Sequence, residues 1–194
     1  MRRMSRFLSL AIPLALMLPQ AVTWPAGSEH SYIGSKKCKM CHLKEWQSWS
    51  TTKMANAFDL LKPGANAEVK KKAGLDPAKD YTKDTTCLQC HTTGYGKPGG
   101  FASFETTPEL AGVGCEMCHG AGGTYTESEY MSLKNKEYKK EEVVKVGLVG
   151  QITQEQCTAC HNTKSPFVGA GYVFDFEAKK AKGTHEKFPL KYQH

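Results

Sequence analysis

The chain has no cysteine outside a repeated five-residue motif, and only 40% of its 194 residues are hydrophobic. Downstream of the amino-terminal segment, no apolar run approaches the roughly twenty residues that a transmembrane helix needs. The alternation typical of strands is equally scarce, and 171–176 is the single candidate. These absences argue against an integral membrane protein and against a sheet-based fold. They indicate a helical chain whose own apolar core is thin.

All eight cysteines lie in four copies of the pentapeptide Cys-x-x-Cys-His. The copies are Cys38-Lys-Met-Cys41-His42, Cys87-Leu-Gln-Cys90-His91, Cys115-Glu-Met-Cys118-His119 and Cys157-Thr-Ala-Cys160-His161. This pentapeptide is the attachment site of c-type haem, in which two thiols add to the porphyrin vinyl groups and the adjacent histidine binds the iron. The motifs therefore predict four covalently bound haem c groups. The four motif histidines are the predicted proximal iron ligands.

Zinc sites and a disulfide framework are the alternative interpretations of these cysteines. Zinc binding also uses paired Cys-x-x-Cys, but it does not require a histidine after each second cysteine. Disulfide bonding gives no reason for the same spacing to occur four times. Because the chain has only seven histidines, four such neighbours by chance are improbable. Covalent haem attachment accounts for the spacing and for the histidines.

Residues 1–26 have the layout of a secretory signal peptide. Three arginines precede an apolar run over 7–18, and 19–26 is rich in small residues and helix breakers. The run is too short to cross a bilayer. We expect cleavage between residues 21 and 26, export to the periplasm or the cell surface, and one tetrahaem domain over 27–194.

The formal net charge of +7 does not point to nucleic acid. Without the three amino-terminal arginines, 23 basic residues stand against 19 acidic ones, a net charge of +4. Each haem then adds two propionates. Lysine clusters remain that either dock an acidic redox partner or form a solvated face. They lie at 70–72, 139–140 and 179–191.

The remaining pattern predicts a mainly α fold: a single haem-cored domain with short helices, long loops and little β. Apolar residues at helical spacing over 43–61 predict a helix that ends at a Lys-Pro-Gly turn. Further helices are expected at 65–73, 108–112 and 154–161, and as a pair within 124–146. Because four porphyrins supply much of the apolar surface, we expect the chain without haem to be largely unfolded.

Few residues are left to bind the irons from the distal side. Outside the motifs the histidines are His30, His185 and His194. Met54 and Met131 are the remaining methionines, because the others leave with the signal segment or lie inside attachment motifs. Five candidates thus serve four irons, and only three are imidazoles, so not every haem can be bis-histidine within one monomer. Each candidate also has an alternative, purely structural interpretation. Methionines often only fill a core, and histidines near a chain end often bind no metal.

Five segments resemble the tetrahaem cytochrome c-554 family. They are 32–38, 48–58, 60–64, 112–120 and 157–162. The resemblance spans nearly all of the expected mature chain and implies a helical domain with stacked haem pairs that acts as a soluble electron carrier. In nitrifying bacteria the family takes electrons from hydroxylamine oxidoreductase. The resemblance also implies that the haem of the second motif, bound by His91, lacks a sixth ligand.

Two departures from the family concern the distal ligands. Met54 stands where the family has an axial histidine, so the resemblance suggests that Met54 reaches the haem of the third motif. The family places another axial histidine shortly after the third motif, and 120–129 contains none. The haem of the first motif is therefore left to Met131, to His30 or to a residue of a neighbouring molecule.

His185 lies downstream of the fourth motif, about where the family places the ligand of that haem. The resemblance therefore pairs it with His161. His194 and His30, near the chain ends, are the natural donors to a neighbouring molecule.

The favoured function is a periplasmic electron carrier, not an enzyme, that docks transiently with a donor and an acceptor in respiration. Two alternatives stay open. A haem with an open position could reduce a small nitrogen oxide, although no distinctive Arg-Tyr-His cluster stands beside a motif. Alternatively, the chain is a subunit of a cytochrome filament or multi-haem complex, in which self-association supplies the missing axial histidine.

Overall fold

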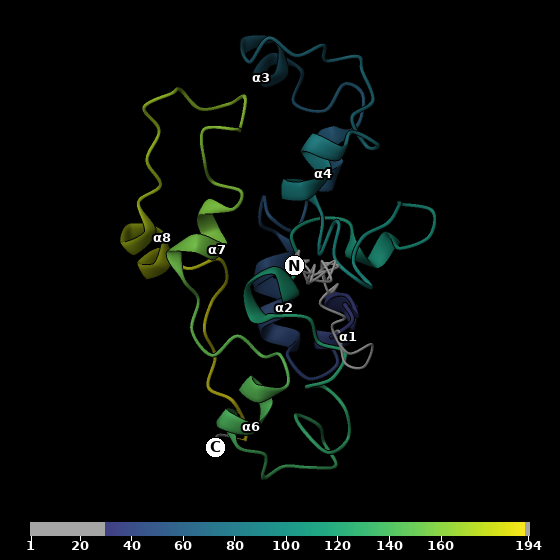
Figure 1. Cartoon of the computed structure of the whole chain (residues 1–194), viewed down its shortest axis with the longest axis vertical. Helices are drawn as coiled ribbons and strands as arrows, with labels where there is room; N and C mark the ends of the chain where they lie inside the picture. The colour runs from purple at the N-terminus through teal and green to yellow at the C-terminus, as the bar shows by residue number, and fades with distance from the viewer. Residues whose placement is uncertain (1–29, 193–194) are drawn as a thin grey trace, which may run out of the picture.

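The computed structural model describes residues 30–192, which form short helices joined by long loops (Figure 1). The α-helices and the 3-10 helices η1 and η2 are α1 Ser35–Cys38, α2 Leu43–Ser50, η1 Phe58–Leu61, α3 Ala67–Lys72, α4 Thr85–His91, η2 Pro108–Leu110, α5 Glu116–His119, α6 Lys140–Lys145, α7 Gln154–Thr158 and α8 Phe176–Lys182. Within the described part, β pairing is limited to one isolated antiparallel bridge between Thr92 and Ala111. The predicted mainly α fold is confirmed. The expected signal segment and His194 lie outside the described residues.

Figure 1 shows α3 and α4 toward one end of the molecule and α6 toward the other, with α1 and α2 between them. The helices α7 and α8 occupy one flank. Beyond α8 the chain turns back, because the backbone N–H of Glu186 donates to Ser48 Oγ at 2.9 Å. Farther along, Lys136 Nζ lies 5.6 Å from the ring centroid of Tyr192. The carboxyl-terminal segment therefore passes α2 and continues toward the end that carries α6. None of the helices between residues 30 and 192 has the length and apolar character to cross a membrane.

The single helix predicted over 43–61 is wrong in extent. The helix α2 ends at Ser50, and turns separate it from η1. Side-chain hydrogen bonds compete with the helical pattern here. The hydroxyl of Thr51 donates to the carbonyl of Ser48 at 3.1 Å, and the carboxamide of Asn56 donates to the carbonyl of Ser50 at 3.1 Å.

Two further expectations are wrong. Within 124–146 one helix forms instead of two, because 124–139 consists mostly of turns and bends. The strand candidate 171–176 is not a strand, and α8 begins at its end, where Asp175 Oδ1 accepts the backbone N–H of Ala178 at 3.0 Å. The other expected helices form in shorter versions, as α3 within 65–73, η2 within 108–112 and α7 within 154–161.

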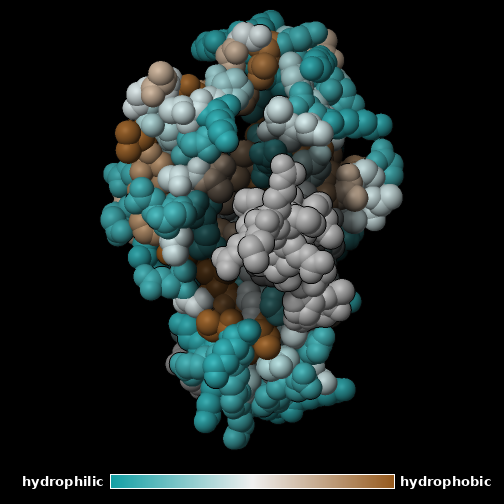
Figure 2. All heavy atoms as spheres, viewed as in Figure 1, coloured by the Kyte–Doolittle hydropathy of each residue, from teal (hydrophilic) through white to brown (hydrophobic). Residues whose placement is uncertain are grey.

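The apolar core is small and lies beside the second motif. Nine apolar side chains are buried between residues 30 and 192, and six of them form one cluster: Phe58, Leu61, Tyr81, Leu88, Phe101 and Leu110. This cluster packs η1 against α4. Between 144 and 192, no apolar side chain is buried. Figure 2 shows apolar residues, in brown, lying at the surface in the middle of the visible face. The predicted thin core is confirmed, and much of the domain has little apolar packing of its own.

One lysine of the 70–72 cluster is unavailable to a partner. Lys70 is buried, and its Nζ donates to the carbonyl of Lys62 at 2.8 Å. The ammonium also lies 5.3 Å from the ring centroid of Tyr81, a favourable cation–π position. Lys70 therefore supports the turn between η1 and α3.

Candidate functional site

Each Cys-x-x-Cys-His motif is wound into a helical turn. In three motifs the backbone N–H of the histidine donates to the carbonyl of the first cysteine at 2.9 Å, and the pairs are His42 with Cys38, His119 with Cys115, and His161 with Cys157. The second motif lies inside α4. Residues three and four positions apart share one face of a helix, so each turn presents two thiols and an imidazole on the same side. All eight cysteines are free.

This donor set fits covalent haem better than zinc. A structural zinc ion needs four ligands around one point. Among the described residues, no three histidine, cysteine, aspartate or glutamate side chains surround a position that could hold a metal ion. Haem attachment needs only the two thiols and the imidazole of a single motif. The exposed apolar side chain of Leu43, beside the first motif, also suits contact with a porphyrin.

The motifs are neighbours in an order that differs from the sequence. Thiol hydrogen bonds join Cys38 with Cys115 and Cys90 with Cys160, and Cys118 lies close enough to Cys157 for their charges to interact. The attachment points therefore run in the order first, third, fourth and second motif. Two of the links pair the first motif with the third and the second with the fourth.

In the chain before haem is attached, a hydrogen bond between the two thiols of each close pair shifts their pKa values in opposite directions. The interaction with Cys38 lowers the pKa of Cys115 to about 6. The interaction with Cys160 lowers the pKa of Cys90 to about 7.

A buried carboxylate in the third motif binds the backbone of the segment that precedes the first motif. Glu116, inside the third motif, is 2% exposed and accepts backbone N–H groups from Ile33 at 2.9 Å, Gly34 at 2.8 Å and Gly122 at 2.7 Å. Hydrogen bonds to an ionised acceptor are strong, and three of them offset the burial of the charge. Burial, with a smaller contribution from Glu116, raises the pKa of Tyr32.

A buried threonine ties the second motif to the third. Thr93 Oγ1 donates to the carbonyl of Gly112 at 2.8 Å and accepts the backbone N–H of Gly114 at 2.8 Å. Next to it, Met117 Sδ accepts the backbone N–H of Gly94 at 3.2 Å. The thioether of Met117, in the third motif, is thus engaged by the segment that follows the second motif.

The proximal imidazoles are prepared to bind metal. His91 Nδ1, assigned as the protonated nitrogen, donates to the carbonyl of Ala57 at 2.6 Å, which leaves Nε2 for the iron. Burial and two neighbouring imidazoles lower the pKa of His119. Burial, with a smaller effect of a lysine ammonium, lowers the pKa of His161. Each shift favours the neutral imidazole, which is the form that binds a metal ion.

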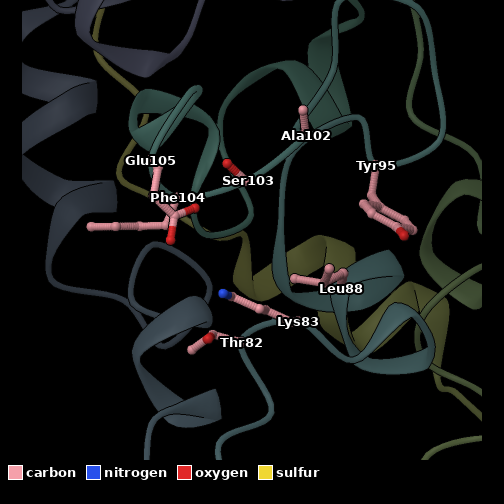
Figure 3. A pocket seen from close by; sticks show the side chains of 8 residues that line it. All are labelled: Thr82, Lys83, Leu88, Tyr95, Ala102, Ser103, Phe104 and Glu105. Carbon is pink, nitrogen blue, oxygen red and sulfur yellow. The ribbon is translucent and has the colours of Figure 1, made fainter.

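A cavity of about 300 Å³ lies beside the second motif. Its lining residues are Thr82, Lys83, Leu88, Tyr95, Ala102, Ser103, Phe104 and Glu105 (Figure 3). Leu88, between the two cysteines of the motif, forms part of the wall, and the ammonium of Lys83 projects toward Phe104 and Glu105. None of the candidate distal ligands lines this cavity.

The structure brings His185 to the third motif. Its ring centroid lies 6.3 Å from that of His119, with 40° between the ring planes. The resemblance pairs His185 with His161, and that pairing stays a prediction; in the structure the segment after α8 returns to α2. The ring stacked on His161 is that of Phe174, at a centroid distance of 4.8 Å.

The other described candidates also lie near the third motif or the loop that follows it. The carbonyl of Met54 accepts the backbone N–H of Val113 at 2.9 Å. His30 Nδ1 lies 2.9 Å from Thr124 Oγ1, so this histidine is held against the loop after the third motif. Met131 is half-buried farther along that loop. Their roles as distal ligands stay predictions.

Sequence reasoning missed the residues that hold the motifs together. The sequence marks Glu116 in one way, because it is an acidic residue inside an attachment motif. It does not mark Thr93 or Ser48. Their partners are distant in sequence or are backbone groups, which no residue pattern marks.

Comparisons with known proteins identify the family of this chain. The model of the family described as cytochrome c554 and c-prime matches residues 37–120. Cytochrome c-554 of Nitrosomonas europaea is 38% identical over 181 residues, which cover 82% of this chain and 77% of that protein. The solved structure of the reduced state of cytochrome c554 from Nitrosomonas europaea matches with a TM-score of 0.69 at 37% identity, covering 84% of this chain and 88% of that one. The chain therefore belongs to the cytochrome c-554 family and is a tetrahaem c-type cytochrome that functions in electron transfer.

Proposed function

We propose that the chain is an exported periplasmic electron shuttle that docks briefly with separate redox proteins. Both cysteines of each motif attach a haem, and His42, His91, His119 and His161 bind the irons on the proximal side. When bound, haem supplies one-electron oxidation and reduction of its iron. Export and a single domain over 27–194 are proposed from the amino-terminal pattern.

The main support for this proposal is that each of the four motifs lies next to another motif. The interactions of Cys38 with Cys115, Cys118 with Cys157, and Cys90 with Cys160 leave no motif isolated. Electron tunnelling weakens steeply with distance, so a carrier needs its redox centres to be neighbours. Glu116 and Thr93 support this arrangement, because they fix the third motif against the segments of the first and second.

The surface around the first motif is suited to an acidic partner. Four lysines there are exposed: Lys36, Lys37, Lys39 and Lys44. Glu45 is the single acidic residue between 34 and 52. Met40, 74% exposed, lies among these lysines. An apolar spot surrounded by cationic groups favours fast, short-lived docking.

Electron exchange between purified holoprotein and reduced flavodoxin, an acidic one-electron donor, tests the proposal. We expect reduction of all four haems, with a second-order rate that falls as salt is raised. The double variant Lys36→Glu/Lys44→Glu should slow the reaction several-fold, whereas the control Lys71→Glu/Lys72→Glu, on the remote helix α3, should not. Equal rates for the two variants would reject the docking surface, and no exchange would reject the shuttle.

Two further measurements address the other functions. Reduced protein supplied with hydroxylamine or nitric oxide should show no sustained consumption, and steady turnover would make it an enzyme. Light scattering should give a monomer, and concentration-dependent growth would favour a filament subunit. Mass spectrometry of the periplasmic fraction should show an amino terminus between residues 22 and 27 and four haems.

A further inference from the structure

We propose that the buried carboxylate of Glu116 lowers the reduction potentials of the two haems attached at the first and third motifs. This inference rests on the haem attachment in the proposed function. Glu116 is not an iron ligand, and it acts on the irons through its charge.

Glu116 lies between two attachment sites. In the third motif it directly follows Cys115. Its carboxylate accepts the backbone N–H groups of Ile33 at 2.9 Å and Gly34 at 2.8 Å, in the segment that precedes the first motif. Gly34 is followed by α1, which ends at Cys38, the first cysteine of that motif. One carboxylate therefore lies beside the attachment points of two haems.

The hydrogen bonds of Glu116 are those of an ionised carboxylate. Oε1 accepts the N–H of Ile33 and, at 2.7 Å, that of Gly122, whereas Oε2 accepts that of Gly34. A backbone N–H can only donate, so none of these contacts provides an acceptor for a carboxyl proton. The side chain is 2% exposed, and none of the ion pairs found between residues 30 and 192 includes it. The negative charge is therefore buried, held by backbone N–H groups and not neutralised by a cation.

The influence of this charge extends to the first motif. Burial raises the pKa of Tyr32, and the carboxylate of Glu116 raises it further. The same carboxylate adds to the raised pKa of Cys38, after the hydrogen bond to Cys115, burial and the charge of Cys115. In both cases Glu116 opposes the formation of a second negative charge nearby. Cys38 is one of the thiols that attach the first haem in the proposed function, so the field acts where that haem is bound.

Reduction of a haem adds one electron and therefore one negative charge. A fixed negative charge nearby makes this addition less favourable, and the effect is strongest where water does not screen it. Burial and local charge are among the means by which a protein sets a haem potential. Glu116 is the single buried acidic residue between residues 30 and 192. The haems of the first and third motifs are therefore better electron donors than they would be without it.

Redox titration of the holoprotein, followed by NMR of haem methyl groups assigned to each motif, tests the proposal. In Glu116→Gln we expect the potentials at the first and third motifs to rise, with little change at the second and fourth. Glu116→Asp disturbs the same hydrogen bonds but keeps the charge, so its potentials should stay near those of the unmodified protein. The control Glu155→Gln, at an exposed glutamate beside the fourth motif, should shift none of the four.

A second variant keeps the test decisive if Glu116→Gln does not assemble. Ile33 is half-buried, and a Cβ on Gly122 would lie 2.8 Å from Ile33 Cδ1 and 3.2 Å from Glu116 Oε1. The two side chains are therefore neighbours. Ile33→Lys adds a cation beside the carboxylate and leaves the carboxylate in place. It should raise the same two potentials, by less than Glu116→Gln.

Unchanged potentials at the first and third motifs in Glu116→Gln, or in Ile33→Lys where only that variant assembles, would overturn the proposal. An equal rise in Glu116→Gln and Glu116→Asp would assign the effect to packing and reject the role of the charge. The same rise at all four haems, or a rise in Glu155→Gln, also counts against it. Haem content reports on the proposed function independently. Four haems with unshifted potentials would reject the role of Glu116 alone, whereas fewer than four haems in the unmodified protein would reject the function.

Discussion

The carboxylate of Glu116 accepts the backbone N–H of Gly34 at 2.8 Å. The two residues are 82 positions apart, and each stands beside or within an attachment motif. The contact is buried, and two more backbone donors converge on the same carboxylate. It therefore sets the position of the first motif relative to the third.

Replacing Glu116 by glutamine should destabilise the holoprotein by about 2 to 3 kcal/mol, because three backbone N–H groups, two of them in buried hydrogen bonds, lose a carboxylate acceptor. The measurement is the midpoint of urea unfolding at neutral pH. Glu68→Gln is the matched control, since Glu68 forms an exposed pair with Lys71 and should change the midpoint little. A similar shift in both variants would contradict the role of Glu116.

Thr93→Val should cost about 2 kcal/mol, because it leaves the carbonyl of Gly112 and the N–H of Gly114 without this partner. The neighbouring change Thr92→Val should cost less. The hydroxyl of Thr92 donates to the carbonyl of Leu88, which also accepts the backbone N–H of Thr92 and so keeps a partner. Thermal unfolding of the two variants checks the order, and the reverse order would refute the argument.

Gly112→Ala should strongly impair assembly. Gly112 has φ 86°, and a Cβ there would lie 2.2 Å from the carbonyl oxygen of Ala55. Gly64 has φ 75° with nothing within 4 Å of its Cβ position, so Gly64→Ala isolates the backbone strain, about 1 kcal/mol. We expect Gly112→Ala to lose about 3 kcal/mol or more. Yield and urea midpoint of the two variants should differ clearly, and equal values would exclude the clash.

Acid should weaken the start of α4 through Asp84. Hydrogen bonds from the hydroxyl and backbone N–H of Thr86 lower the pKa of Asp84. A lowered folded pKa means that stability is present above the unfolded value, about 4, and is lost as pH falls through the folded value. Asp84→Asn should therefore flatten the decline of the melting temperature below about pH 4. Glu129→Gln, at an exposed carboxylate, should leave that decline unchanged.

Removing one haem should unfold the region that has no core of its own. The variant Cys157→Ser/Cys160→Ser should carry three haems by mass. Because no apolar side chain is buried between 144 and 192, α7 and α8 should lose protection from hydrogen exchange. The core around Phe58 and Leu88 should keep its protection. Full protection of α7 and α8 would show that their order does not depend on haem.

Helix prediction succeeded where the signals are local. Thr153, just before the run 154–161, forms a capping pair with Gln156, and Gly74 directly follows the run 65–73. It failed at Ser50, where side-chain hydrogen bonds end a helix whose apolar spacing continues. The helix α8 was not predicted, because the aromatic residues before it resembled a strand. Its sequence does carry helix signals: Asp175 at the N-cap, a glutamate in the first turn and lysines in the last turn.

The sequence by itself determined the chemistry of the attachment sites, their number and the helical class, because each motif needs only five consecutive residues to present two thiols and an imidazole. Only the tertiary structure decided which motifs are neighbours and where His185 lies. Those relations depend on contacts such as that of Glu186 with Ser48, 138 positions apart. Such contacts form when the chain packs, and no local pattern records them.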